Sequence, residues 1–116
     1  LLQKRYPKDS FIAHIGGDDF FVGLRNHEFK KVFDLTNKVQ IEFKNSVENL
    51  YSKKDKEKGL LIAKDRFNIE RSFNLLSVSS AIIEINPNSN ISNFDSTLNV
   101  LKKASKGSSK PISSIL

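Results

Sequence analysis

The sequence predicts an α/β fold in which a mainly antiparallel sheet is covered by helices. Two short apolar runs flank a pair of glycines near the start of the chain, and a long stretch with helical spacing of apolar residues follows them. Further strand-like runs then precede a last helical stretch. Hairpins with tight turns, combined with helices that are apolar on one face, are typical of this class.

The first expected element is a hairpin over 10–24. Its runs are rich in Phe, Ile and Val, and the adjacent Gly16 and Gly17 supply the positive φ of a tight turn. Glycines also leave the turn without side chains, so an anionic ligand can approach the backbone. Asp18 and Asp19 follow at once, and paired carboxylates suit a divalent cation that carries phosphates. The alternative is a plain hairpin turn with a solvated acidic flank.

The later elements are expected from periodicity and from breaks in it. Apolar residues recur at the spacing of one helical stripe, then a glycine ends the pattern, and runs of alternating or apolar residues follow it. Residues 1–107 are interpreted as one partial domain. The expected elements are a helix at 27–51, an extra hairpin at 60–73, a strand at 74–85, a helix at 93–104 and a tail or linker at 108–116.

Composition narrows the class of protein. A chain of 116 residues that is 38% hydrophobic fits one domain with a modest core. The absence of cysteine excludes disulfides and thiolate metal sites and favours a reducing cytoplasm. No apolar run reaches the roughly 18 residues of a membrane helix. The net charge of +6 comes partly from lysines interleaved with acids at 53–58, which is typical of a solvated helix end, and no nucleic-acid partner is expected.

Three stretches, in this order, resemble the GGDEF domain, the diguanylate cyclase family of bacterial signalling. Residues 16–20 resemble its signature, with Asp19 where Glu is usual. Residues 76–81 resemble a later strand, 94–102 resemble the last helix, and Lys106 falls where Arg is usual. The resemblance covers the C-terminal two-thirds of such a domain, without its first strand and helices, so we expect a longer parent chain. An extra hairpin of this kind resembles the subgroup joined to EAL and CBS domains.

The resemblance implies a specific chemistry. Two domains, each with one GTP, meet as a homodimer, and each ribose 3′-hydroxyl attacks the α-phosphorus of the other GTP to form cyclic di-GMP. Mg²⁺ or Mn²⁺ is the implied cofactor, and sensory, EAL or CBS domains are the implied neighbours. The implied roles are metal ligation and catalysis for Asp18, metal ligation for Asp19, close approach of the nucleotide for Gly16 and Gly17, and phosphate binding for Lys102 and Lys106.

Several departures from the family pattern bear on activity. The Asp19 side chain is one methylene shorter than Glu, Asn99 stands where Tyr is common, and Ser105 stands where Gly is common. Pro7 and Ser10 occupy the positions where an inhibitory product site requires Arg and Asp, so feedback binding is not expected. Without the first strand and helices the guanine pocket lacks its floor, so the isolated chain is expected to be inactive.

Two hypotheses follow for the parent protein. It is a diguanylate cyclase, or it is a catalytically silent GGDEF module that binds GTP or dimerises and regulates a neighbouring domain. Plain structural interpretations stand beside them: Lys102 and Lys106 also suit an exposed helix end, where cations complement the helix dipole. His14 is a lone strand histidine to which we assign no functional role.

Overall fold

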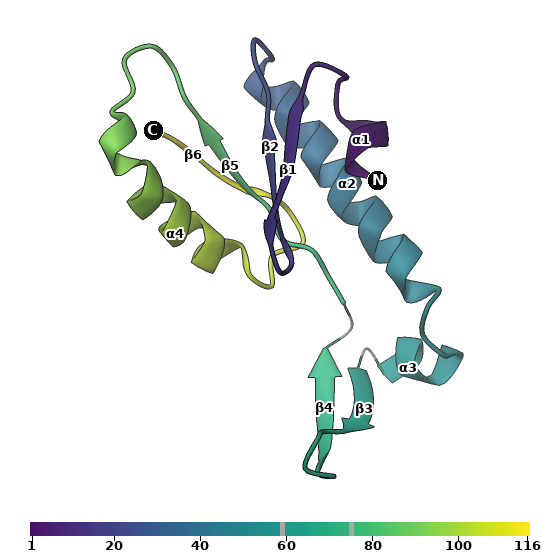
Figure 1. Cartoon of the computed structure of the whole chain (residues 1–116). Coiled ribbons are helices and arrows are strands. Elements are labelled where there is room, and N and C mark those ends of the chain that lie inside the picture. The colour runs from purple at the N-terminus through teal and green to yellow at the C-terminus, as the bar shows by residue number, and fades with distance from the viewer. Residues whose placement is uncertain (59, 75) are drawn as a thin grey trace. The chain divides into compact units, whose positions relative to one another are not determined.

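The structure is a computed structural model that describes residues 1–58, 60–74 and 76–116, without the side chains of 58, 60, 61, 73 and 74. It has mixed helices and strands, as the predicted class requires (Figure 1). The elements are α1 (Leu2–Arg5), β1 (Phe11–Gly16), β2 (Asp19–Gly23), α2 (Phe29–Glu48), α3 (Lys53–Lys58), β3 (Leu60–Lys64), β4 (Glu70–Asn74), β5 (Ala81–Glu84), a 3-10 turn (Ile91–Asn93), α4 (Phe94–Ser105) and β6 (Ile112–Ile115).

The described strands pair two by two rather than in one sheet. Strands β1 and β2 form one antiparallel pair, β3 and β4 form a second, and β5 pairs with β6 in parallel. In the described part of the chain the strands therefore form three two-stranded sheets instead of the single sheet that was expected, and two of the three pairs are antiparallel. Parallel neighbours need a crossover connection, and α4 supplies it by packing against both β5 and β6.

The chain divides into two compact units. Unit 1 comprises residues 1–40 and 79–116, and unit 2 comprises residues 41–78. Unit 2 contains the hairpin β3–β4 and α3, which contacts β3. Within it the amide of Leu76 donates a 2.9 Å hydrogen bond to the hydroxyl of Tyr51. Composition bounds the size of a core but does not fix how the chain is divided around it.

The buried centre of unit 1 is small. Its buried apolar residues are Tyr6, Val39 and Leu101, which come from the end of α1, from α2 and from α4. The Tyr6 hydroxyl and the Thr36 hydroxyl lie 2.8 Å apart in a buried hydrogen bond, and burial raises the pKa of Tyr6. The Gln40 amide on α2 donates a 2.9 Å bond to a backbone carbonyl just before β6. These contacts join segments that are distant in sequence into one unit.

Helix α2 is shorter than expected. It ends at Glu48, where the amide of Leu50 turns back to the carbonyl of Val47 and leaves the Leu50 side chain 79% exposed. A new helix then starts, because the Ser52 hydroxyl accepts from the amide of Asp55 and donates to its carboxylate. This Ser-x-x-Asp arrangement is a variant of the capping box and marks the start of α3. The helix expected over 27–51 is therefore replaced by α2, a short break and the start of a second helix.

The expected strand at 74–85 and the expected tail at 108–116 are both corrected. Only Ala81–Glu84 forms a strand. Just before it, the carbonyl of Ser80 accepts a 3.0 Å hydrogen bond from the amide of Ile112 on β6, but residues 76–80 are not part of a strand. The alternation of apolar and serine residues at 76–80 favours an extended backbone, but a strand also needs a partner. The tail contains β6, whose pairing with β5 is a long-range contact. The helix expected at 93–104 is confirmed as α4, and none of the described helices is long and apolar enough to cross a membrane.

Candidate functional site

The glycine turn between β1 and β2 forms as the sequence predicts. Gly16 pairs with Asp19 across the hairpin, so Gly17 and Asp18 are the two connecting residues. The φ angles of Gly16 and Gly17 are 145° and 55°, in the region that favours glycine. No heavy atom lies within 4 Å of the place where a Cβ would stand on either glycine. The turn therefore needs glycine for its backbone shape and leaves open space above that backbone.

His14 stabilises the turn through two contacts. Its Nε2 lies 2.7 Å from the carbonyl oxygen of Gly17, to which a protonated Nε2 donates. Its ring is stacked on Phe20 with the centroids 4.5 Å apart. The register shifts between His14 and Gly16, so an extra residue, Ile15, bulges from β1. These contacts explain His14 as a structural residue.

The two carboxylates of the turn are in different situations. The Asp18 side chain is exposed, and no described group forms a hydrogen bond or ion pair with it. Asp19 is also exposed, but its Oδ2 lies 3.3 Å from Nζ of Lys102. Lys102 is on α4, so this ion pair joins the hairpin to a helix that is 83 residues away in the sequence. The structure thus places Lys102 beside the turn that contains Gly16, Gly17, Asp18 and Asp19, so five of the six predicted site residues lie at one end of the hairpin.

Lys106 lies just beyond the end of α4. Helix α4 ends at Ser105, and Lys106 has φ −59° and ψ 125°, which is outside the helical region. Gly107 then takes a positive φ of 79°, and the amide of Ser108 bonds back to the carbonyl of Ser105. Lys106 therefore does not share a helix face with Lys102. It remains an exposed cation next to the end of α4.

The turn offers a metal ion only part of a coordination shell. The described residues contain no cluster of three or more His, Asp or Glu that would hold a metal ion alone. Asp18 and Asp19 provide two carboxylates, and Asp19 is shared with the Lys102 ammonium. Mg²⁺ is commonly held by one or two carboxylates together with phosphate oxygens and water. The donor set therefore fits an ion that arrives with a phosphate ligand better than a resident structural ion.

A surface depression of about 330 Å³ lies at the other end of β1. It is lined by Gln3, Pro7, Lys8, Ser10 and Ile12, and none of the predicted site residues reaches it. The Ser10 hydroxyl is buried there with no hydrogen-bond partner among the described residues. With Pro7 and Ser10 on its wall in place of Arg and Asp, the depression lacks the charged pair that the resemblance would require for bound product.

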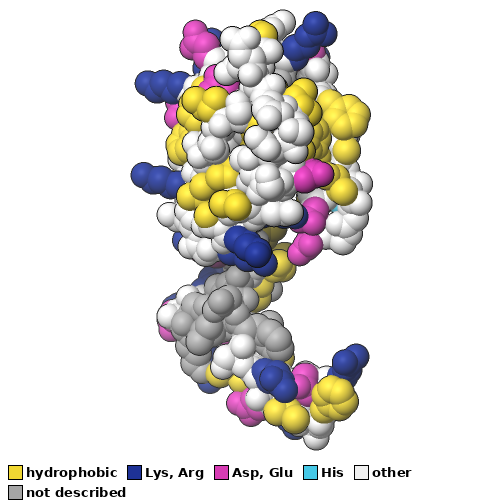
Figure 2. Space-filling model, turned by 90° about the vertical axis from the view of Figure 1, so that its left-hand side faces the viewer, with side chains coloured by type: hydrophobic (Ala, Val, Ile, Leu, Met, Phe, Trp, Pro, Cys, Tyr) yellow, Lys and Arg dark blue, Asp and Glu magenta, His cyan; other side chains and the backbone are white. Residues whose placement is uncertain are grey.

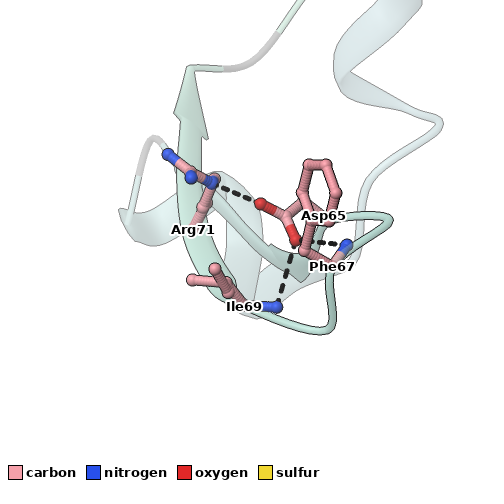
Figure 3. Close-up of polar contacts among 4 residues, drawn as sticks. All are labelled: Asp65, Phe67, Ile69 and Arg71. Atoms are coloured by element: carbon pink, nitrogen blue, oxygen red, sulfur yellow. Dashed lines mark hydrogen bonds and ion pairs between the residues drawn. The ribbon is translucent and has the colours of Figure 1, made fainter.

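The structure also shows an acid that sequence analysis did not single out. Asp65 closes the connection of hairpin β3–β4, as Figure 3 shows: its Oδ1 accepts from the amides of Phe67 at 2.8 Å and Ile69 at 3.1 Å. Its Oδ2 forms an ion pair with Nε of Arg71 at 2.5 Å. The Arg71 guanidinium first, and then these amides, lower the pKa of Asp65. The sequence signal was available, since Asp followed by Asn at a positive φ is typical of a side-chain-capped turn.

Comparisons with known proteins do not assign the chain. No protein-family model, no curated protein and no solved structure matches it. The resemblance to the GGDEF domain therefore rests on the order of the three sequence stretches. The structure adds the contact between Asp19 and Lys102, which places a carboxylate and an ammonium side by side at the turn.

Proposed function

We propose that unit 1 is a GGDEF-type module of the cytoplasm that binds GTP together with Mg²⁺ or Mn²⁺ at the turn between β1 and β2. The observation that carries this proposal is the 3.3 Å contact between Asp19 and Lys102. It places a carboxylate, which suits a divalent cation, beside an ammonium, which suits a phosphate. A metal–triphosphate complex presents both charges at once and can engage both groups.

The exposed Asp18 carboxylate adds to this argument. It is uncommitted within the described part of the chain, so a ligand does not have to displace a protein group from it. The open glycine backbone of Gly16 and Gly17 lets a phosphate approach amide groups that a side chain would shield. Lys102 would then meet the phosphate oxygens that the metal does not contact. A bound divalent cation would neutralise charge on the transferring phosphorus.

For a parent protein that carries this chain, we propose diguanylate cyclase activity. In a homodimer, each ribose 3′-oxygen loses its proton and forms a bond to the α-phosphorus of the other GTP, while the bond to pyrophosphate breaks. In this proposal Asp18 would serve as a metal ligand and as an acceptor near the attacking hydroxyl. EAL, CBS or sensory domains are the proposed neighbours in the same polypeptide.

The alternative is a silent GGDEF module that binds GTP, or only dimerises, and regulates a neighbour. Two observations favour it for the isolated chain. Lys102 already neutralises Asp19, which is also the shorter acid at that position. Asn99 on α4 stands where the resemblance has Tyr, and Ser105 is 3% exposed with its hydroxyl bonded to the carbonyl of Lys102, so the Ser105 hydroxyl is not available to a ligand.

Binding of a fluorescent GTP analogue to the 116-residue chain, with and without Mg²⁺, tests the proposal. Asp18→Asn should weaken Mg²⁺-dependent binding by at least about tenfold, because it removes a charge from the proposed metal site. Asp34→Asn removes an equal charge from the exposed face of α2 and is the matched control. Equal affinity for both variants, or no saturable binding by the unchanged chain, would contradict the proposal.

An assay of a longer polypeptide then separates the two hypotheses. Incubation with GTP and Mg²⁺, followed by chromatography, should yield cyclic di-GMP that disappears in Asp18→Ala if the parent is a cyclase. Saturable GTP binding without product would identify the silent module.

A further inference from the structure

The direction of one peptide group decides what the turn between β1 and β2 offers to a ligand. Gly17 and Asp18 are the central residues of this turn, and Gly17 has a φ of 55°. Among the described non-glycine residues, only Asn26 and Asn68 have a positive φ, so the φ of Asp18 is negative. A positive φ at the first central residue alone defines a type II′ turn. Types II′ and I′ differ by a flip of the peptide that joins the two central residues.

His14 holds this peptide in one of its two orientations. A carbonyl accepts hydrogen bonds and cannot donate them, so the ring donates in the 2.7 Å contact between His14 Nε2 and the Gly17 oxygen. The ring lies nearly parallel to that of Phe20, at 10°, and this stacking restricts its rotation. The bulge at Ile15 is next to His14, and bulges commonly redirect a neighbouring side chain. A flip to type I′ would turn the Gly17 oxygen away from the ring and break this bond.

The same contact sets the direction of the Asp18 amide. The described part of the chain has no cis peptide bond, and the carbonyl and N–H of a trans peptide point in opposite directions. Because the Gly17 oxygen faces His14, the Asp18 amide points away from that ring. No described group accepts a hydrogen bond from this amide. Asp18 therefore offers two groups at once, an oriented amide for a phosphate oxygen and a carboxylate for a divalent cation.

Charge alone does not direct an anion to this turn. The net charge of +6 attracts anions to the chain in general, and Lys and Arg side chains stand apart from one another on the face drawn in Figure 2. Lys102, the cation beside the turn, is already paired with Asp19. A donor that points in a fixed direction before the ligand arrives lowers the entropic cost of binding. The orientation of the Asp18 amide is therefore a property on which affinity for a phosphate depends.

We propose that His14 is a positioning residue for the metal–nucleotide ligand and acts through the peptide between Gly17 and Asp18. This inference rests on the proposed function, because it names the residue that orients the groups of that same site. Without the His14 bond, part of the population takes the flipped orientation, and the apparent affinity falls by that fraction. Loss of one hydrogen bond of ordinary strength corresponds to about a two- to tenfold change.

Two replacements of His14 separate positioning from stability. His14→Phe keeps a ring that can stack on Phe20 but lacks the donor, whereas His14→Gln keeps an N–H donor but lacks the ring. His14→Phe should weaken Mg²⁺-dependent binding of the fluorescent GTP analogue by about two- to tenfold. His14→Gln should restore most of that affinity, even where thermal unfolding shows it to be the less stable of the two. A purely structural role predicts that affinity follows stability, which is the opposite order.

The other histidine of the chain supplies the matched control. His27 Nε2 lies 3.8 Å from the carboxylate of Asp9, which precedes β1 and is not part of the turn. His27→Phe makes the same chemical change as His14→Phe and should leave the affinity unchanged. An equal loss in both variants would overturn the role of His14.

NMR spectroscopy tests the peptide orientation without a nucleotide. The amide protons of Gly17 and Asp18 are far apart in a type II′ turn and close together in type I′. The nuclear Overhauser effect between them should be weak in the unchanged chain and in His14→Gln, and stronger in His14→Phe. Failure of the unchanged chain to bind the analogue would contradict the proposed function together with this role. Unchanged affinity of His14→Phe, or a weak effect in its spectrum, would overturn the role of His14 alone.

Discussion

The hairpins β1–β2 and β3–β4 have strands of similar length, yet they use their acidic residues in opposite ways. In β3–β4, the Asp65 carboxylate accepts from two amides of its own connection and pairs with Arg71. In β1–β2, glycine backbone angles and His14 close the turn, and Asp18 has no described partner. A carboxylate at a turn is available to a ligand only where the turn does not need it. This difference makes the first hairpin the candidate site and the second a self-contained structural element.

The largest effect is expected from breaking the backbone that closes the first hairpin. Gly16→Ala places a side chain at φ 145° and should lower the free energy of unfolding by about 1–3 kcal/mol, because L-residues are strained there. Gly23→Ala is the control: Gly23 has no positive φ, and an added Cβ would meet Phe21 at an ordinary 3.4 Å. Its effect should stay at about 1 kcal/mol or less. Urea denaturation measures both, and equal losses would show that the turn conformation does not matter.

Local pattern allowed these hairpins and α4 to be predicted, whereas long-range pairing did not follow from it. The glycine pair, the apolar runs and the helical stripe are signals within a few residues of one another. By contrast, β6 is a short Ile-Ser-Ser-Ile segment after a proline, and only its pairing with β5 makes it a strand. Residues 76–80 show the converse, because alternation predicted a strand there, whereas the strand begins only at Ala81 and, of these residues, Ser80 alone bonds to β6. Sequence therefore located elements but not their neighbours.

The candidate site follows the same division between local features, which were predicted, and long-range contacts, which were not. The residues of the turn were identified from spacing, and the Asp19–Lys102 contact agrees with their grouping. The helix was predicted to end at 104, and α4 ends at Ser105, so Lys106 lies just outside it. The Gly107 signal for that end was present in the sequence.

The anchoring of the first hairpin gives the second prediction. Tyr6 lies just before β1, and Tyr6→Phe should cost about 1 kcal/mol, because the buried Thr36 hydroxyl loses its partner. Tyr51→Phe in unit 2 is the matched control and should cost less, since the bond to the Leu76 amide is exposed. Thermal unfolding of both variants measures the difference. A larger effect of Tyr51→Phe would show that the second unit depends more on tertiary contacts than the first.

The same tyrosine predicts a pH dependence. Burial first of all raises the pKa of Tyr6 above its ordinary value of 10.0, although the Thr36 bond partly offsets this. The folded state therefore favours the protonated hydroxyl. Its contribution to stability is complete below pH 10.0 and is lost as the pH rises through the higher folded pKa. Tyr6→Phe should abolish that alkaline loss, and an unchanged profile in unfolding experiments would contradict the assignment.

The second hairpin should respond at the acidic end of the pH scale. Arg71, and then the amides of Ile69 and Phe67, lower the pKa of Asp65 below its ordinary 3.8. Its stabilising effect is thus present above pH 3.8 and is lost as the pH falls through the lower folded value. The amide signals of Phe67 and Ile69 should report this step in an NMR titration, and Asp65→Asn should remove it. A midpoint above 3.8 would show that the carboxylate is not held as described.

The smallest effect on stability is expected for the pair that the proposed function needs most. Asp19 and Lys102 are about half exposed, so a double-mutant cycle with Asp19→Asn and Lys102→Gln should give a coupling of about 0–1 kcal/mol. Because the pair is open to solvent, salt near about 1 M, where the Debye length is about 3 Å, should remove that coupling. A weak pair separates readily when a ligand offers each group a stronger partner. A coupling well above 1 kcal/mol that resists salt would instead show a structural link, as in the Asp65 turn, and neither group would then be available to a metal–phosphate ligand.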